Sequence, residues 1–320
     1  MLKAFRIKLA GIIAVLAAGC FHASAQAPGV PICVLGRQES QYQSALVDAA
    51  RDLFAAGDGL RMSAARKQLK RPSCQLVVPE ANTTRLPARE VCVAARRSHV
   101  RIGWWHLCAN CGKWHLNLGG GYWLTADGAA ATCFHVVEPS GEMKDGCLVA
   151  VDDEGRVFPV AEVLAANRES DAAIVRVAGE GFTPLPLNTN LYPGDTVYCY
   201  SDPVEHRDYF SAGIVNRFYQ PAGSRASGSR ASATAGPTRI NVSTDWAPGS
   251  SGSAVLDECG NVIGHVSMVS TPNGPPSAAS SPASGAKPKA QPAQPPRPTP
   301  IVFHEAVSAR DVRRLIKAPK

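Results

Sequence analysis

Apolar residues recur at two different spacings along the chain, one before residue 97 and another after it. In residues 38–56 they return every three or four positions, which predicts an amphipathic helix with one buried face. The residues of that face are Tyr42, Ala45, Leu46, Ala49 and Leu53. Two shorter helices are predicted over 63–70 and 87–97. We therefore expect residues 26–97 to form a helical extension resembling a prodomain, with packing as its simplest role.

After residue 97 the chain becomes a series of short runs rich in Val, Ile, Tyr and Trp, separated by Gly, Asp, Asn and Pro about every ten residues. Many short strands at regular spacing predict a β-barrel or a β-sandwich. The predicted strands are 98–107, 114–125, 147–151, 172–177, 196–201, 210–219, 239–244, 253–256, 262–269 and 301–307. Ser308 is then predicted to cap a final helix that reaches Lys317. The expected domain is mainly β and covers residues 98–317.

Two stretches interrupt this domain. Residues 221–238 consist mostly of Ala, Ser, Gly and Arg, and residues 272–300 mostly of Pro, Ala, Ser and Lys. Such compositions bury too little apolar surface to offset the entropy lost on ordering. We expect both stretches to be exposed, mobile loops.

The first 25 residues have the pattern of a signal peptide. Basic residues are followed by an apolar run of about ten residues and then by Ala23, Ser24 and Ala25. The run is too short to span a bilayer, and no later stretch approaches the roughly 20 apolar residues needed. We expect cleavage before Gln26 and a periplasmic or secreted protein without a transmembrane segment. The run LAAGC, ending at Cys20, leaves lipoprotein processing open as an alternative.

Charge and cysteine content exclude few classes of function. The formal net charge is +7, but the basic residues are scattered, whereas nucleic-acid binding favours a concentrated basic face with interleaved aromatic residues. We expect no nucleic-acid partner. Removal of the signal would leave nine of the ten cysteines, so at least one is free, metal-bound or paired outside the chain.

A candidate nucleophile lies in the run DWAPGSSGSAV. A glycine two residues before Ser251 and another directly after it predict a tight turn that projects the serine hydroxyl. The amides of Gly249 and Ser251 would then point at one spot and form an oxyanion hole. His135 and Asp171 precede the serine in that order, 36 and then 80 residues apart. Each is ordinary alone; together they match an acid–base–nucleophile set.

Four ordered motifs then identify a family resemblance. They are GGGYWLTADGAAATCFHVV from Gly119, SDAAIVRV from Ser170, GDTVYCYSDP from Gly194 and GSSGSAVLDECGNVIGHVS from Gly249. Residues 98–316 resemble the trypsin-like (chymotrypsin-fold) serine proteases, and within them the bacterial HtrA/Deg branch without a PDZ domain. The resemblance implies two six-stranded antiparallel β-barrels with the active site in the cleft between them. With the predicted helices, the expected fold is mainly β, flanked by an N-terminal helical extension and a C-terminal helix.

The resemblance also implies roles for individual residues. His135 would act as general base and then acid, Asp171 would fix its tautomer, and Ser251 would attack the scissile carbonyl. A substrate would pair with the strand that starts at Gly264, which makes Gly264, His265, Val266 and Ser267 the predicted contacts. The implied activity is that of a serine endopeptidase that acts on polypeptides through an acyl-enzyme and needs no cofactor. A catalytically inactive binding protein of the same fold is the alternative.

Two features stay open at the level of sequence. Asp245 lies six residues before Ser251, where it could form the floor of a pocket for Lys or Arg or serve a structural role. The run HLCANCGKWH holds Cys108 and Cys111 in the spacing of a zinc knuckle, with His106 and His115 available as further ligands. In an oxidising compartment a disulfide between Cys108 and Cys111, or pairing with other cysteines, is at least as good a prediction, and no metal is assigned to the site.

Overall fold

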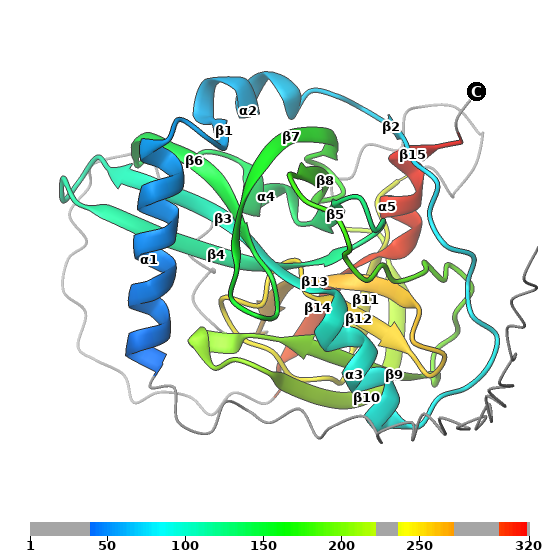
Figure 1. The fold of residues 1–320 in the computed structure, drawn as a ribbon. Coiled ribbons are helices and arrows are strands. Elements are labelled where there is room, and N and C mark those ends of the chain that lie inside the picture. Colours follow the sequence, from blue (N-terminus) through cyan, green and yellow to red (C-terminus); the bar gives the residue numbers. More distant parts are fainter. Residues whose placement is uncertain (1–38, 222–235, 272–300, 319–320) are drawn as a thin grey trace, which may run out of the picture. The chain divides into compact units, whose positions relative to one another are not determined.

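The computed structural model describes residues 39–221, 236–271 and 301–318. The predicted signal peptide of residues 1–25, including Cys20, lies outside the described residues. So do residues 272–300 and all but the ends of the stretch 221–238. Figure 1 shows the arrangement of the described elements.

Helices stand mainly at the two ends of the described chain. Their bounds are α1 (Glu39–Ala55), α2 (Met62–Gln68), α3 (Ala88–Ser98), α4 (Phe134–Val137) and α5 (Ala309–Arg314), with a 3₁₀ turn η1 at Pro203–Glu205. The three helices predicted before residue 98 are therefore present. Ser308 caps α5 by accepting a hydrogen bond from the Arg310 amide, as predicted, but the helix ends at Arg314.

Strands make up most of the remaining described chain. The first group is β1 (Leu60–Arg61), β2 (Cys74–Gln75), β3 (His99–Cys108), β4 (Trp114–Trp123), β5 (Ala129–Thr132), β6 (Met143–Val151), β7 (Val157–Asn167) and β8 (Ala172–Val177). The second group is β9 (Thr196–Ser201), β10 (Tyr209–Tyr219), β11 (Arg239–Val242), β12 (Ala254–Asp257), β13 (Val262–Ser270), β14 (Phe303–Ser308) and β15 (Ile316–Lys317).

The first barrel is formed by β3 to β8. Its antiparallel strands follow the order β6-β3-β4-β5-β8-β7, and pairing between β6 and β7 closes the ring. Alternate residues of β3, namely Val100, Ile102 and Trp104, point into the barrel core with Trp123 of β4. The short strand β1 adds to β6 as a seventh strand of this sheet.

The second barrel is a closed ring of β10-β11-β14-β13-β12-β9. Its core is built from alternate aliphatic residues of these strands, such as Val197, Ile240, Val255 and Ile263, and from Trp246. The predicted fold class, mainly β with two six-stranded antiparallel barrels, is therefore confirmed. Each barrel buries the inward face of its strands, and β5, β11 and β12 are buried at every position, which accounts for the short apolar runs in the sequence.

Two local predictions are wrong. No strand was predicted over Val157–Asn167, because Pro159 and the run of alanines lower its β-propensity, yet β7 pairs along both of its edges. The turn at Asp127 and Gly128 predicts a short apolar strand that ends on His135, but this strand stops at Thr132 and His135 lies in the single turn α4. Phe134 and Val137 bury one side of this turn, so His135 faces outward.

The N-terminal extension contacts both barrels. Tyr42, Leu46 and Ala50 of α1 are buried against the outer face of the first barrel, so both faces of β3 are covered. Beyond α2, the parallel pair β2–β15 joins residues 74–75 to the end of the described chain, and α3 packs on β9 and β12 of the second barrel.

No helix among the described residues is both long enough and apolar enough to cross a membrane.

We expect Leu46→Ala to lower the free energy of unfolding by about 3 kcal/mol, because the side chain is 1% exposed and its loss leaves a cavity under α1. Denaturant unfolding measures the change. Val77→Ala is the control, since Val77 is 74% exposed and its truncation should cost less than about 0.5 kcal/mol. Equal effects of the two substitutions would show that α1 is not packed as described.

Candidate active site

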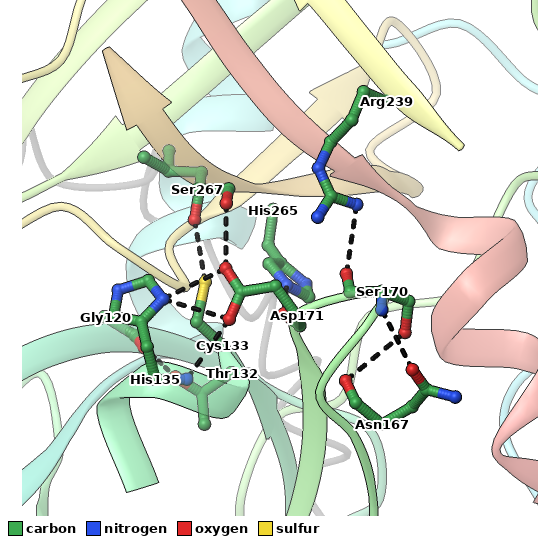
Figure 2. A network of polar contacts seen from close by, with 11 residues as sticks. Gly120, Thr132, Cys133, His135, Asn167, Ser170, Asp171, Arg239, His265 and Ser267 are labelled. Atoms are coloured by element: carbon green, nitrogen blue, oxygen red, sulfur yellow. Dashed lines mark hydrogen bonds and ion pairs between the residues drawn. The ribbon is translucent and has the colours of Figure 1, made fainter. Parts of the chain in front are cut away.

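His135 and Asp171 form a hydrogen-bonded pair at the edge of the first barrel. The Nδ1 atom of His135 lies 3.0 Å from each carboxylate oxygen of Asp171, and the His135 amide donates to Oδ1 at 3.1 Å. The His135 side chain is 49% exposed, while that of Asp171 is only 15% exposed. Figure 2 shows the imidazole edge-on to the carboxylate. A carboxylate can only accept, so Nδ1 carries the proton, and Nε2 is left for a substrate or nucleophile.

The turn between β7 and β8 places Asp171 for this bond. Asn167 accepts the Ser170 amide through its side chain at 2.9 Å, and the Asp171 amide donates to the Arg168 carbonyl at 3.2 Å. Asp171 itself has φ 55, in the left-handed region that aspartate tolerates better than most residues. The chain then enters β8 directly, so the carboxylate is held by a short and closed turn.

The second barrel supplies the remaining partners of Asp171. Ser267 of β13 donates its hydroxyl hydrogen to Oδ2 at 2.8 Å, and His265 Nε2 donates to the Asp171 carbonyl at 3.2 Å. Burial by itself raises the pKa of Asp171, but the hydrogen bond and charge of His135 and the Ser267 hydroxyl outweigh it and lower the pKa to about 2. Complete burial lowers the pKa of His265 to about 4, so this second imidazole is neutral.

Ser251 lies in a turn flanked by two glycines in the left-handed region, Gly249 with φ 98 and Gly252 with φ 92. The Ser250 amide donates to Ala247 and the Gly252 amide to Val266. Within the described residues, the amides of Gly249 and Ser251 donate to no acceptor. Two free neighbouring N–H groups at a serine turn are the donors that an oxyanion hole needs.

Ser251 and His135 line one cleft of about 690 Å³ between the barrels. No hydrogen bond connects the two side chains in the described part of the chain, which is common for a catalytic pair without substrate. No residue of 39–97 lines this cleft, so the described extension does not occupy it. The lining residues are Phe134, His135, Glu138, Arg168, Asp171, Arg239, Trp246, Ala247, Pro248, Ser251, Val266, Ser267, Met268 and Val269.

The structure corrects part of the predicted substrate strand. Gly264 and His265 pair with β12 on one edge and with β14 on the other, and both polar backbone groups of Val266 bond to Ser253 and Gly252. These three residues therefore cannot offer a free edge to a substrate. The side chain of His265 is also fully buried. Of the four predicted contacts, only Ser267 remains available through its backbone, and its hydroxyl is engaged by Asp171.

Asp245 lies away from this cleft. It is exposed and lines a separate cavity of about 430 Å³ with residues of β10, β11 and β14. Its amide and carbonyl both bond to the Ser211 hydroxyl at 3.1 Å, so this backbone segment is tied to β10. The side chain of Asp245 thus lines a surface outside the cleft, and its contact with a substrate side chain stays a prediction.

Two further residues contact this network without having been singled out for it. The thiol of Cys133 is fully buried, donates to the Val266 carbonyl at 3.1 Å and lies near both His135 and Asp171. Burial raises the pKa of Cys133 well above its ordinary value, so the thiol is uncharged and serves only for packing. Arg239, also buried, donates to the Ser170 carbonyl at 3.1 Å. Only the position of Cys133 two residues before His135 could have indicated a role.

Among the residues that the structure describes, two groups of side chains have a spacing that could hold a metal. In the first, Cys133, His135 and Asp171, the carboxylate is already bonded to His135 and Ser267 and the thiol is kept protonated, so an ion would have to displace the pair. The second is Cys108, Cys111 and His115, which lines no part of the cleft.

We expect Ser267→Ala to destabilise the protein by about 2 kcal/mol near neutral pH, since it removes a hydrogen bond to an ionised carboxylate. Because the pKa of Asp171 is lower in the folded protein, its ionised form stabilises the fold at pH values above the ordinary aspartate pKa of about 4. This stabilisation is lost as the pH falls to about 2. The difference between Ser267→Ala and wild type should shrink across this window when unfolding is measured at several pH values. Ser140→Ala, an exposed serine, is the control. A difference that does not change with pH would contradict the assigned bond.

The comparisons with known proteins agree with this geometry. The family profile described as a trypsin-like peptidase domain matches residues 119–264. "Putative protease Do-like 14" of Arabidopsis thaliana is 30% identical over 158 residues, which cover 46% of this chain and 34% of that protein. "Probable periplasmic serine endoprotease DegP-like" of Ectopseudomonas mendocina (strain ymp) is 27% identical over 160 residues, which cover 49% and 31% respectively. The chain thus spans about a third of the length of these relatives.

A solved structure supports the fold alone. A variant of the HtrA-type protease AlgW, solved with a tripeptide, aligns with 71% of this chain and 62% of its own, at a TM-score of 0.51 and 14% identity. Residues 119–264 therefore match the profile of a trypsin-like peptidase domain, and the chain is similar to the Do-like and DegP-like proteases named above.

Proposed function

We propose that the protein is a serine endopeptidase in which Ser251 is the nucleophile, His135 the general base and Asp171 the residue that orients it. One observation carries the proposal. The bonded His135–Asp171 pair and Ser251 line the same cleft, and the Ser251 turn carries two amides that donate to no acceptor among the described residues. An inactive binding protein of this fold would need none of these features, so they favour the enzyme.

In the proposed reaction, Ser251 Oγ attacks the scissile carbonyl carbon while His135 Nε2 takes the hydroxyl proton. The negative charge that develops on the carbonyl oxygen is stabilised by the amides of Gly249 and Ser251. Collapse of the tetrahedral intermediate breaks the C–N bond, and His135 returns the proton to the leaving amine. Water, activated by the same imidazole, then hydrolyses the acyl-enzyme. Asp171 stays ionised throughout, as expected of a carboxyl whose pKa is lowered to about 2.

The end of β13 is the proposed binding edge for an extended substrate. From Met268 to Ser270 this strand pairs with β14 only, Ser267 lies at the irregularity before this segment, and the earlier residues also pair with β12. Trp246 Nε1 donates to the Met268 carbonyl at 3.2 Å, which ties the strand to the loop before Ser251. A peptide added along this edge would pass Ser251 in the strand-addition mode of recognition.

The cleft favours an apolar residue before the cut. Its wall next to Ser251 is made by Trp246, Ala247, Pro248 and Val266, with Val269 farther along β13. Asp245, the only acidic group predicted for such a pocket, lines another cavity. A Lys or Arg side chain would therefore lose hydration at this wall without gaining an ion pair from Asp245.

The location proposed for the protein is the periplasm or the exterior. The pattern of residues 1–25 supports export, and one relative is named as periplasmic. Polypeptides, including unfolded proteins, are the proposed substrates. If Cys20 were acylated instead of removed, the protein would be found in the membrane fraction, which cell fractionation distinguishes.

We expect a fluorophosphonate probe to label the purified protein covalently, because such a probe reports a serine that is activated by a base and faces an oxyanion hole. Ser251→Ala should abolish labelling, and His135→Ala should nearly do so. Asp171→Asn should lower peptide turnover by about 10⁴-fold, since His135 would be held in the wrong tautomer.

Ser250→Ala is the matched control within the same turn. Its hydroxyl is fully buried and has no hydrogen-bond partner in the described structure, so labelling should persist. If the wild-type protein neither reacts with the probe nor cuts unfolded proteins, the proposed enzyme function is contradicted. The alternative of an inactive binding protein would then be favoured.

We expect a peptide library to be cut after Val, Leu or Ala at least about tenfold faster than after Lys or Arg, because the wall beside Ser251 is apolar. Asp245→Asn should leave this profile unchanged. Cleavage after Lys or Arg that disappears in Asp245→Asn would instead place its carboxylate in the pocket.

A further inference from the structure

The hairpin of β3 and β4 presents two chemically different faces at its tip. His106 and His115 are directly paired across the hairpin, and their rings lie 5.8 Å apart between centroids. Cys108 follows two residues after His106 and so shares this face. Trp105 and Trp114 stack on the opposite face, where Phe54 of α1 packs on Trp114. One face of the hairpin thus packs against α1, and the other face carries potential metal ligands.

The turn at the tip brings a second cysteine back to the first. The Cys108 amide donates to Lys113 and the Gly112 amide to Cys108, which closes a tight loop. Gly112 has φ 67, and a Cβ placed there would meet nothing within 4 Å, so the glycine serves the backbone conformation rather than space. The Asn110 amide donates to the sulfur of Cys108 at 3.4 Å. Amides aimed at a sulfur stabilise a thiolate.

The side chains converge without any backbone movement. The sulfur atoms of Cys108 and Cys111 and a ring nitrogen of His115 all lie within 4.8 Å of one another, and Cys111 Sγ is 3.0 Å from His115 Nε2. In a tetrahedral zinc site, bonds of about 2.3 Å to sulfur and 2.0 Å to nitrogen place the ligand atoms about 3.5–3.8 Å apart. Small rotations of exposed side chains would therefore complete three bonds.

His106 lies across the hairpin from His115, but it is not among the side chains whose ligand atoms lie within 4.8 Å of one another. Its Nδ1 donates to the Trp104 carbonyl at 3.4 Å, which leaves Nε2 unprotonated. Metal-binding histidines commonly donate their other ring nitrogen to a carbonyl in this way. Thiolate and imidazole ligands at tetrahedral spacing select zinc over calcium or magnesium.

We propose that Cys108, Cys111 and His115 bind a Zn²⁺ ion at the tip of the β3–β4 hairpin, with His106 across the hairpin from His115. None of these residues lines the cleft of Ser251, so the site is structural and stands apart from the proposed peptidase activity. The ion would hold the hairpin whose opposite face receives α1.

The test is metal analysis of the purified protein, treated with a reductant and then supplied with zinc alone. We expect about one zinc per chain, and a thiolate-to-metal charge-transfer band with tetrahedral visible bands when Co²⁺ replaces it. Cys111→Ser and His115→Ala should each weaken zinc binding by more than about 100-fold. Cys259→Ser is the matched control, because Cys259 is a free thiol far from the hairpin in the sequence.

The cobalt spectrum of the wild-type protein tests the site without any substitution, so this part of the test does not depend on how well a variant folds. Reduced protein that takes up no zinc would overturn the proposal. So would mass spectrometry that finds Cys108 disulfide-bonded to Cys111 in protein isolated directly from its own compartment. Zinc that stays bound in Cys111→Ser would also overturn it, since the ion would then lie elsewhere.

Discussion

The close approach of two backbones, at Gly120 of β4 and at the Ser251 turn, is the constraint on which the candidate site depends. The Gly120 amide donates to the Ser251 carbonyl at 2.7 Å, and Thr132 donates its hydroxyl hydrogen to the Gly120 carbonyl at 2.7 Å. A Cβ on Gly120 would lie 2.0 Å from the Ser253 hydroxyl, and one on Gly252 would lie 2.2 Å from the Gly120 carbonyl. Only glycine fits either position. The Ser251 turn of the second barrel is thereby held against Gly120 of the first, which is also bonded to Thr132, three residues before His135.

Buried charged side chains make a second connection between the barrels. The carboxylate of Asp171 accepts from His135 of its own barrel and from Ser267 of the other. At another point, Asp202 of the second barrel lies 3.2 Å from His99 and 3.5 Å from Arg101 of β3, all of them buried. Burial raises the pKa of Asp202, but these two partners outweigh it and hold the pKa low. A buried carboxylate tolerates this environment only while its partners stay in place, so both contacts couple the two barrels.

Much of this arrangement could be predicted from the sequence, because barrel strands alternate buried and exposed residues and the turns between them carry Gly and Asp. The proximity of His135, Asp171 and Ser251 was predicted instead from their order along the chain and from the resemblance of the motifs around them. The short helix α4 was missed because one turn of FHVV is as apolar as a strand, and β7 because its alanines gain their burial from both neighbouring strands. Pairing of Gly264 on both edges and the direction of Asp245 depend on contacts between distant strands, which no local pattern records.

The extension before β3 has a consequence for how the chain could be processed. It adds β1 to the first barrel and β2 to the end of the chain, and its α3 packs on the second barrel. Ser98 at its boundary is buried and accepts the Trp123 amide through its hydroxyl. A cut of the peptide bond after Ser98 would therefore yield a nicked, two-fragment molecule held together by buried side chains and strand edges. After such a cut, the fragment could leave only if both barrels opened at their margins. The rate at which this segment is removed would therefore be limited by local unfolding and not by the cleavage itself.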